Sequence, residues 1–404
     1  MRIAINGYEA VLPRFGFDEK TKLPIRVGSS AYCFELLKNL NKIDRKNNYT
    51  VFLPTKPTSD LPKETQNWKY KIISKRKLWT ITALIPHLLF GRREIDVFFN
   101  PGHYLPPFAP QKSVISILDV SYLYFPELFK KNDLVKLKNW TKYSLKKAKK
   151  ILTISNSSRN DIIKEYGVDD KKVRVTYLAV DSNPNTKTLN MEDLKRKFGI
   201  DKDYILFVGT LQPRKNIAKL IEAFSKIRID ANNYSESTRI KSHSDGLGPK
   251  IRKNSDLQLV IVGKRGWKYE EILSAPEKFG VKNRVLFIHN ASDEDLPSLY
   301  KNAVCFVLPS LYEGFGLPVL EAMKYGCPVL TSNVSSLPEA GGDAAVYFDP
   351  NSAEDIAQKV EKVISDQKLR EEMVKKGYNQ IKKFSWEKTA RETLDALEEV
   401  VKNG

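Results

Sequence analysis

The sequence predicts an α/β protein with two doubly wound parallel sheets, one in each half of the chain. Its length of 404 residues favours two domains of roughly 200 residues each. Short apolar runs also alternate with stretches of helical period, as in parallel sheets whose strands are joined by crossover helices. The runs include Arg2–Asn6, Tyr49–Leu53, Val97–Asn100, Val114–Leu118 and Ile151–Ser155 in the first half, and Tyr204–Gly209, Leu257–Gly263, Val285–His289, Ala303–Pro309 and Cys327–Ser332 after residue 200.

A polar stretch, Asp181–Thr188, separates the two series of strands and is the best linker candidate. We therefore predict a first domain of residues 1–180 and a second of residues 181–383, facing each other across a cleft, followed by an amphipathic segment at 384–404. Within the second domain, Asp230–Asp256 is rich in Asn, Ser, Lys and Gly and shows no sustained period. This composition predicts a mobile surface insertion.

The positive charge is concentrated in the first half of the chain. Residues 1–180 hold 33 Lys and Arg against 16 Asp and Glu, a surplus of 17 out of a net +19. Such a surplus attracts nucleic acid, an anionic membrane surface or a diphosphate-bearing substrate. No nucleic-acid-binding module is recognisable, so we expect no nucleic acid partner, although a basic nucleic-acid-binding protein remains an alternative.

The sequence also bears on location. Met1–Asn6 leads directly into a strand pattern, without a secretory signal, and no run approaches the roughly 18 apolar residues that span a bilayer. We therefore expect a cytoplasmic protein whose contact with a membrane is peripheral.

Two glutamates mark the junction of a predicted strand and a predicted helix in Leu308–Ser332. Glu313 precedes the helix, which begins near Gly316, and Glu321 lies about two turns further along it. Gly314 and Gly316 leave backbone N–H groups uncovered at the helix N-terminus, where an anion is favoured. Because carboxylates accept hydrogen bonds from hydroxyls, the stretch is a candidate site for sugar, ribose and diphosphate. Alternatively, Glu313 only caps the helix and Glu321 lies on its surface.

Two adjacent cations, Arg214 and Lys215, follow the predicted strand that ends at Gly209. A guanidinium binds phosphate oxygens bidentately and an ammonium adds a point charge, so this pair can offset the charge of a leaving diphosphate without a metal ion. A basic turn exposed to solvent is the alternative. We expect neither Lys215 nor Glu313 to belong to the core.

These segments resemble glycosyltransferase family 4, the retaining transferases with the GT-B fold of two Rossmann-like domains, over nearly the whole chain. Glu313 and Glu321 match the family's E-x7-E motif, which implies contact of Glu313 with the donor hexose and of Glu321 with the nucleoside ribose. Arg214 and Lys215 match the family's basic pair on the donor diphosphate. The resemblance places in the donor site Gly28, Gly209, Gly314, Phe315, Gly316, Leu317 and, within the stretch Ser335–Ala345, Glu339.

Asp119 falls where many family members have a His-Asp pair, and we assign it to the catalytic group. Here Leu118 replaces the histidine, which in the family often contacts the donor sugar, and leucine offers no hydrogen bond. His103, in a neighbouring predicted loop, is a candidate to supply the imidazole to the donor, and a solvated loop histidine is the alternative. A donor-binding protein without transfer activity is therefore also considered.

The resemblance implies a retaining transfer of a hexose from a nucleotide diphospho-sugar, with no cofactor and no metal. The stretches Pro213–Asn216 and Phe125–Glu127 resemble those of mannosyltransferases, which implies GDP-mannose as donor and a role in lipopolysaccharide or other surface polysaccharide synthesis.

The first domain is expected to bind the acceptor, a glycan or a polyprenyl-diphosphate-linked sugar. Two basic stretches, Lys69–Arg93 and Lys130–Lys150, predict peripheral binding to anionic lipid next to the bound acceptor. The apolar residues of the first stretch are Trp79, Ile81, Leu84, Ile85 and Leu88. The alternative is a buried helix with solvated lysines. The resemblance also implies that residues 384–404 pack back on the first domain.

Overall fold

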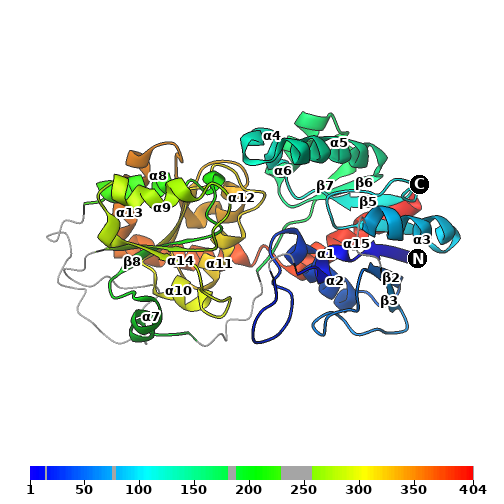
Figure 1. Cartoon of the computed structure of the whole chain (residues 1–404), viewed down its shortest axis with the longest axis horizontal. Helices are drawn as coiled ribbons and strands as arrows, with labels where there is room; N and C mark the ends of the chain where they lie inside the picture. The colour runs from blue at the N-terminus through cyan, green and yellow to red at the C-terminus, as the bar shows by residue number, and fades with distance from the viewer. Residues whose placement is uncertain (14–15, 75–78, 181–187, 229–256, 404) are drawn as a thin grey trace. The chain divides into compact units, whose positions relative to one another are not determined.

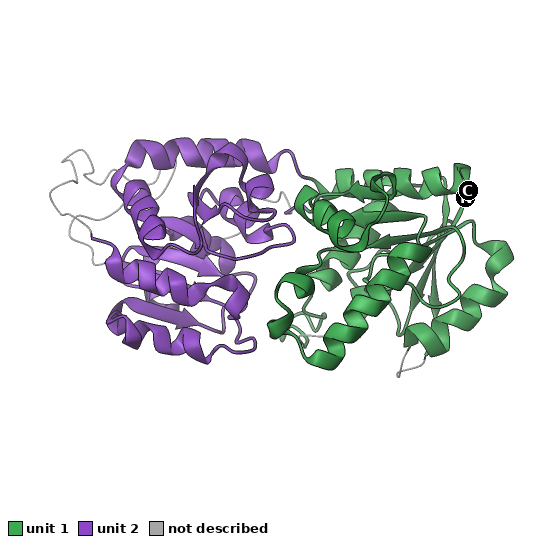
Figure 2. Ribbon diagram, turned by 90° about the horizontal axis from the view of Figure 1, so that it is seen from above, with its two compact units in different colours: residues 1–178, 385–404 green, residues 179–384 purple. Residues whose placement is uncertain are grey.

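The computed structural model describes residues 1–13, 16–74, 79–180, 188–228 and 257–403. They form two compact units (Figure 2). Unit 1 is Met1–Leu178 with Ser385–Gly404, and unit 2 is Ala179–Phe384. The predicted insertion Asp230–Asp256, and the predicted linker except Thr188, lie outside the described residues.

Unit 1 is built on a seven-stranded parallel sheet with the order β3-β2-β1-β4-β5-β6-β7. The strands are β1 (Arg2–Asn6), β2 (Asn48–Leu53), β3 (Trp68–Ile72), β4 (Val97–Asn100), β5 (Ser113–Ser116), β6 (Lys150–Thr153) and β7 (Val173–Val175). The strand order reverses between β1 and β4. In sheets of this kind ligands bind outside the carboxyl ends of the strands at such a reversal.

Helices cover both faces of the unit 1 sheet (Figure 1). One face is covered by α2 (Ser29–Ile43) and α15 (Trp386–Lys402), and the other by α3 (Ile85–Phe90), α5 (Lys131–Lys147) and α6 (Asn156–Tyr166); α1 (Tyr8–Val11) and α4 (Ser121–Tyr124) are short. The last helix of the chain thus belongs to unit 1. Glu399 on α15 accepts hydrogen bonds from Lys150 Nζ and Arg174 Nη2, each at 2.6 Å, which ties α15 to β6 and β7.

Unit 2 contains a six-stranded parallel sheet with the order β10-β9-β8-β11-β12-β13. The strands are β8 (Tyr204–Val208), β9 (Gln258–Val262), β10 (Val285–Ile288), β11 (Cys305–Leu308), β12 (Val329–Ser332) and β13 (Ala345–Phe348). Every residue of β8, β11 and β12 is buried, as expected for strands covered on both faces. The order reverses between β8 and β11, and both cations and both glutamates singled out in the sequence follow these two strands.

Helices also cover both faces of the unit 2 sheet (Figure 1). α8 (Ile217–Lys226), α9 (Glu270–Lys278) and α13 (Ala353–Ser365) pack together on one face; α10 (Leu296–Asn302), α11 (Leu317–Lys324) and α14 (Gln367–Ile381) lie on the other; α7 (Met191–Phe198) and α12 (Leu337–Gly341) complete the unit. The apolar stripe of α8, with Ile217, Leu220, Ile221 and Phe224, is buried.

Three strands were missing from the predicted set, namely β3, β7 and β13. All three are edge strands, and edge strands tend to be short or charged because they pair on one side only. β7 has three residues, and β3 alternates apolar residues with Lys69 and Lys71. The basic stretch Lys69–Arg93 therefore begins with a strand.

The apolar face predicted to contact lipid is mostly core. Trp79, Leu84, Ile85 and Leu88 are buried beneath α3 and the turn before it, and of the five predicted residues Ile81 alone is exposed. The prediction for these four residues was wrong, because period alone does not tell a face that packs on a sheet from one that packs on lipid.

Candidate active site

Arg214 and Lys215 lie in one short turn, Pro213–Lys215, directly after β8. Pro213 begins the turn, and Asn216 ends it with a φ of 56°, a left-handed conformation that asparagine tolerates better than most residues. The Asn216 amide donates to Pro350 O at 2.7 Å, which anchors the turn. Both cations are thereby held at the carboxyl end of β8.

Glu313 follows β11 and meets both cations. Its Oε1 lies 2.5 Å from Lys215 Nζ and accepts from Ser310 Oγ at 2.6 Å, and its Oε2 lies 3.5 Å from Arg214 Nη1. Glu313 is 7% exposed and Lys215 is 9% exposed. The expectation that neither belongs to the core was wrong, because opposite charges that pair can be buried together.

The charges of this cluster determine its protonation. Burial would raise the pKa of Glu313, but the charges of Lys215 and Arg214 and the hydrogen bonds from Lys215 and Ser310 outweigh it and hold that pKa below its usual value. Glu313 is therefore ionised at neutral pH. Two cations against one carboxylate leave the cluster with a net positive charge, which suits an anionic ligand.

Two serines from the loop between β12 and α12 hold the backbone of Glu313. Ser335 Oγ accepts from Glu313 N at 2.9 Å, and Ser336 Oγ donates to Glu313 O at 2.8 Å. Ser335 has a φ of 50°, a conformation that costs energy in a residue other than glycine. Neither serine could be assigned an individual role from its sequence, because nothing local indicates that this loop returns to the end of β11.

The start of α11 combines glycines with a buried ring. Gly316 has a φ of 101°, and a Cβ there would lie 2.9 Å from Leu337 Cδ2. The Phe315 ring is buried and packs edge-to-face on Phe384, with centroids 5.4 Å apart. The Phe315 ring therefore belongs to the core of unit 2. Gly314 precedes it, and Leu317 begins the helix.

Two glycines bring the loops after β8 and β9 together. A Cβ on Gly263 would lie 1.9 Å from Gly209 O, and one on Gly209 would lie 3.3 Å from the Phe207 ring. Gly209 N donates to Val262 O at 2.9 Å. Gly263 was predicted only as the end of a strand and was not assigned to the site. Its position after β9 is equivalent to that of Gly209 after β8, and this equivalence could have indicated it.

Glu321 lies on α11, separate from the charge cluster. Its Oε2 accepts a hydrogen bond from Tyr300 Oη at 3.0 Å. Burial raises the pKa of Glu321, and the hydrogen bond from Tyr300 opposes that rise. Glu339 lies on α12, where its carbonyl accepts from Gln380 Nε2 at 3.1 Å.

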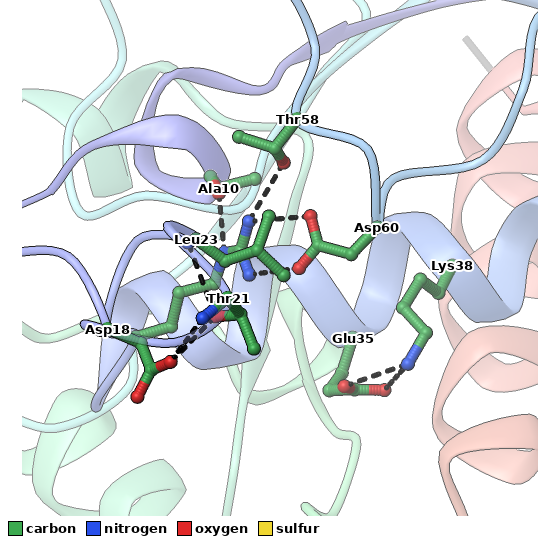
Figure 3. Close-up of polar contacts among 9 residues, drawn as sticks. Ala10, Asp18, Thr21, Leu23, Glu35, Lys38, Thr58 and Asp60 are labelled. Carbon is green, nitrogen blue, oxygen red and sulfur yellow. Dashed lines mark hydrogen bonds and ion pairs between the residues drawn. The ribbon is translucent and has the colours of Figure 1, made fainter.

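In unit 1, Gly28 precedes the first residue of α2 with a φ of 57°, and the space where a Cβ would project is open. The loop before it is anchored by Arg26, which donates to both oxygens of Asp60, at 2.5 and 3.1 Å, and to Ala10 O at 2.7 Å. Ala10, Thr58 and Asp60 lie around the side chain that donates to them (Figure 3).

His103 follows β4 and Asp119 follows β5, so both lie at the carboxyl edge of the unit 1 sheet. The His103 ring packs edge-to-face on Tyr104 and Tyr122, at centroid distances of 5.2 and 6.1 Å. Burial lowers the pKa of His103, and the charge of Asp119 opposes this. Its Nε2 is buried, with no hydrogen-bond partner among the described residues, while the residue as a whole is partly exposed. Asp119 Oδ1 accepts from Ser121 N at 2.9 Å.

Among the described residues, no group of three or more His, Cys, Asp or Glu side chains could hold a metal ion. Within the same ranges, no helix combines the length and apolar character needed to cross a bilayer.

Comparison with known proteins connects these features to a family. Residues 190–380 match the family model described as glycosyl transferases group 1. The chain is 33% identical over 302 residues to O-antigen chain mannosyltransferase B of Escherichia coli, covering 74% of this chain and 73% of that protein. It is 30% identical over 256 residues to the serotype-specific mannosyltransferase WbdA of Escherichia coli, which covers 62% of this chain but only 29% of that longer protein.

A similar fold occurs in sucrose-phosphate synthase from Thermosynechococcus elongatus. The TM-score is 0.69 at 16% identity, and all of both chains is covered. With the two parallel sheets, this likeness confirms the predicted GT-B fold.

Proposed function

Because the chain belongs to the group 1 glycosyltransferases, we propose that it transfers a hexose from a nucleotide diphospho-sugar to a glycan or lipid-linked acceptor during synthesis of a surface polysaccharide. The observation that carries this proposal is the cluster of Arg214, Lys215 and Glu313 at the reversal between β8 and β11. The two relatives are named mannosyltransferases, one of them for the O-antigen chain. Mannose, carried by GDP, is therefore the hexose we propose.

The cluster suits the donor in two ways. Arg214 and Lys215 neutralise the diphosphate as negative charge grows on the departing group, so the reaction needs no metal ion or cofactor. Glu313, held ionised by the two cations, accepts hydrogen bonds from sugar hydroxyls. The backbone N–H groups of Gly316 and Leu317 add donors at the start of α11.

The transfer we propose retains the configuration of the sugar. The bond from the anomeric carbon to the phosphate oxygen breaks, and the acceptor oxygen bonds to that carbon from the same face. The acceptor proton passes to the leaving diphosphate, so no protein base is required.

In unit 1, His103 and Asp119 are the residues that we propose to contact the donor sugar. Leu118 occupies the position at which many family members have a histidine. We propose that His103, which follows the neighbouring strand β4, supplies the imidazole instead. Because burial lowers its pKa, His103 is neutral at neutral pH and acts as a hydrogen-bonding group.

Unit 1 is proposed to bind the acceptor beside an anionic membrane surface. Phe90 is 91% exposed at the end of α3, and Leu89 and Ile81 are also exposed. Arg92 and Arg93 follow directly and are exposed. Apolar side chains beside cations are typical of surfaces that bind peripherally to anionic lipid. A basic nucleic-acid-binding function is not favoured, since the family and the charge cluster explain the chain without it.

The first test is a thermal-shift panel of the purified protein with GDP-, UDP-, ADP- and dTDP-sugars in EDTA, because a ligand that binds the folded state raises the melting temperature. We expect a selective shift with GDP-mannose that is lost in Lys215→Ala. Lys219→Ala is the matched control, since Lys219 lies on α8 and pairs with Glu222 at 2.8 Å, outside the cluster. Absence of any shift in the wild-type protein would contradict the proposal.

A transfer assay then separates an active enzyme from a donor-binding protein. Transfer of radiolabelled mannose to a lipid-linked acceptor, unchanged by EDTA, is the expected result. Binding without transfer would favour the donor-binding alternative.

A further inference from the structure

Tyr300 holds one oxygen of Glu321 from inside unit 2. Its side chain is 0% exposed and lies on α10, while Glu321 lies on the neighbouring α11. The hydroxyl donates to Glu321 Oε2 at 3.0 Å. Burial raises the pKa of Tyr300 well above its usual value, so its hydroxyl stays protonated and remains a donor.

Aromatic neighbours fix the Tyr300 ring. Phe306 on β11 packs against it edge-to-face at 5.5 Å, and Tyr325, directly after α11, stacks on it at 6.0 Å with an interplanar angle of 16°. Because neighbouring rings pack against the Tyr300 ring, the position of its hydroxyl group is fixed. The Glu321 carboxylate, on a partly exposed residue, is therefore held by a rigid buried donor.

We propose that Tyr300 is a positioning residue of the donor site: by occupying Oε2 it orients Glu321 so that Oε1 accepts from the ribose hydroxyls of the nucleotide. The inference rests on the proposed function, which assigns the ribose to Glu321. A carboxylate free to rotate would lose conformational entropy on binding, and Tyr300 removes that cost before the ligand arrives.

The same hydrogen bond favours the ionised form of Glu321. Burial raises the pKa of Glu321 and nearby Asp293 adds to the rise, while Tyr300, Lys324 and Lys215 lower it. Replacing Tyr300 by phenylalanine removes one of the opposing groups, so the pKa rises further. Only the ionised carboxylate accepts hydrogen bonds from both ribose hydroxyls, so nucleotide binding weakens as the pH falls and Glu321 becomes protonated. In Tyr300→Phe this weakening should set in at a higher pH than in the wild type.

Calorimetric titration with GDP and with 2′,3′-dideoxy-GDP tests the inference. We expect Tyr300→Phe to bind GDP about tenfold more weakly than the wild type, as for loss of a hydrogen bond to a charged group. Its affinity for dideoxy-GDP, which lacks the hydroxyls, should be unchanged. Tyr325→Phe is the matched control, since it removes a hydroxyl from the stacked ring and leaves the bond to Glu321; it should bind both ligands like the wild type.

Each contrary outcome has its own meaning. If Tyr300→Phe weakens the binding of GDP and of dideoxy-GDP equally, Tyr300 has a merely structural role. If Tyr300→Phe binds GDP like the wild type at both pH 6 and pH 8, Tyr300 has no role in binding. Either result overturns the inference while the proposed function stands. Failure of the wild-type protein to bind GDP or UDP would overturn both.

Discussion

Lys215 Nζ lies 2.5 Å from Glu313 Oε1, although the two residues are 98 positions apart in the chain. The contact exists because β8 and β11 are hydrogen-bonded neighbours, so the loops after them emerge side by side. The ion pair is buried, so removal of either partner leaves the other without its counter-charge. We therefore propose that the cluster contributes to both catalysis and stability.

Glu313→Gln should lower transfer about 100-fold or more, the usual loss when one electrostatic group is removed from an active site. It should also destabilise the protein by about 3 kcal/mol, since Lys215 is left buried without its counter-charge. Transfer kinetics and urea unfolding measure the two effects. Glu222→Gln, which breaks the ion pair with Lys219 on the surface of α8, should change stability by less than about 1 kcal/mol. Near-normal transfer by Glu313→Gln would contradict the site assignment.

Stability should fall with acid in a way that depends on Glu313. Its pKa in the folded protein is lower than its ordinary value of 4.5, so the unfolded chain takes up the proton first. The stabilisation is complete above that ordinary value and is lost as the pH falls through the lower folded value. Urea midpoints of the wild type and Glu313→Gln, compared at pH 6.5 and at pH 3.5, should therefore converge at the lower pH. A constant difference would mean that the carboxylate is not the titrating group.

Gly263→Ala should disrupt the donor site from a distance. The added carbon would lie 1.9 Å from Gly209 O, so the loop that leads to Arg214 and Lys215 must move. We expect weaker nucleotide binding and a lower melting temperature. Gly199→Ala is the control: Gly199 has a φ of 74° with open space around its Cβ position, so it should cost only about 1 kcal/mol of backbone strain and leave binding intact. Equal effects of the two variants on binding would exclude the clash as the cause.

Phe90→Ser should weaken association with anionic vesicles several-fold, because a phenylalanine that enters the interface contributes about 2 kcal/mol. Sedimentation with phosphatidylglycerol vesicles measures the effect, and added salt should reduce binding of the wild type. Phe108→Ser serves as the control, since Phe108 is 64% exposed in the loop between β4 and β5. If both variants associate with the vesicles like the wild type, α3 is not the membrane-binding element.

Several features could be predicted from single stretches of sequence. Runs of apolar residues marked the central strands of both sheets, and glycine after glutamate marked the start of α11 near Gly316. The strand end at Gly209 located the turn that carries the two cations. Such signals are local, because a strand buried on both faces or a residue with positive φ limits which amino acids its own position accepts.

The tertiary structure alone decided which of these stretches meet. It buried Lys215 against Glu313, brought Ser335 and Ser336 to the Glu313 backbone, pressed Gly263 against Gly209, and turned Trp79 and Leu88 into the core rather than toward lipid. Each of these contacts depends on strand order and on the return of a distant loop. Periodicity indicates which face of a helix or strand is apolar, whereas what covers that face is set by the topology of the sheet, which no single stretch of the sequence contains.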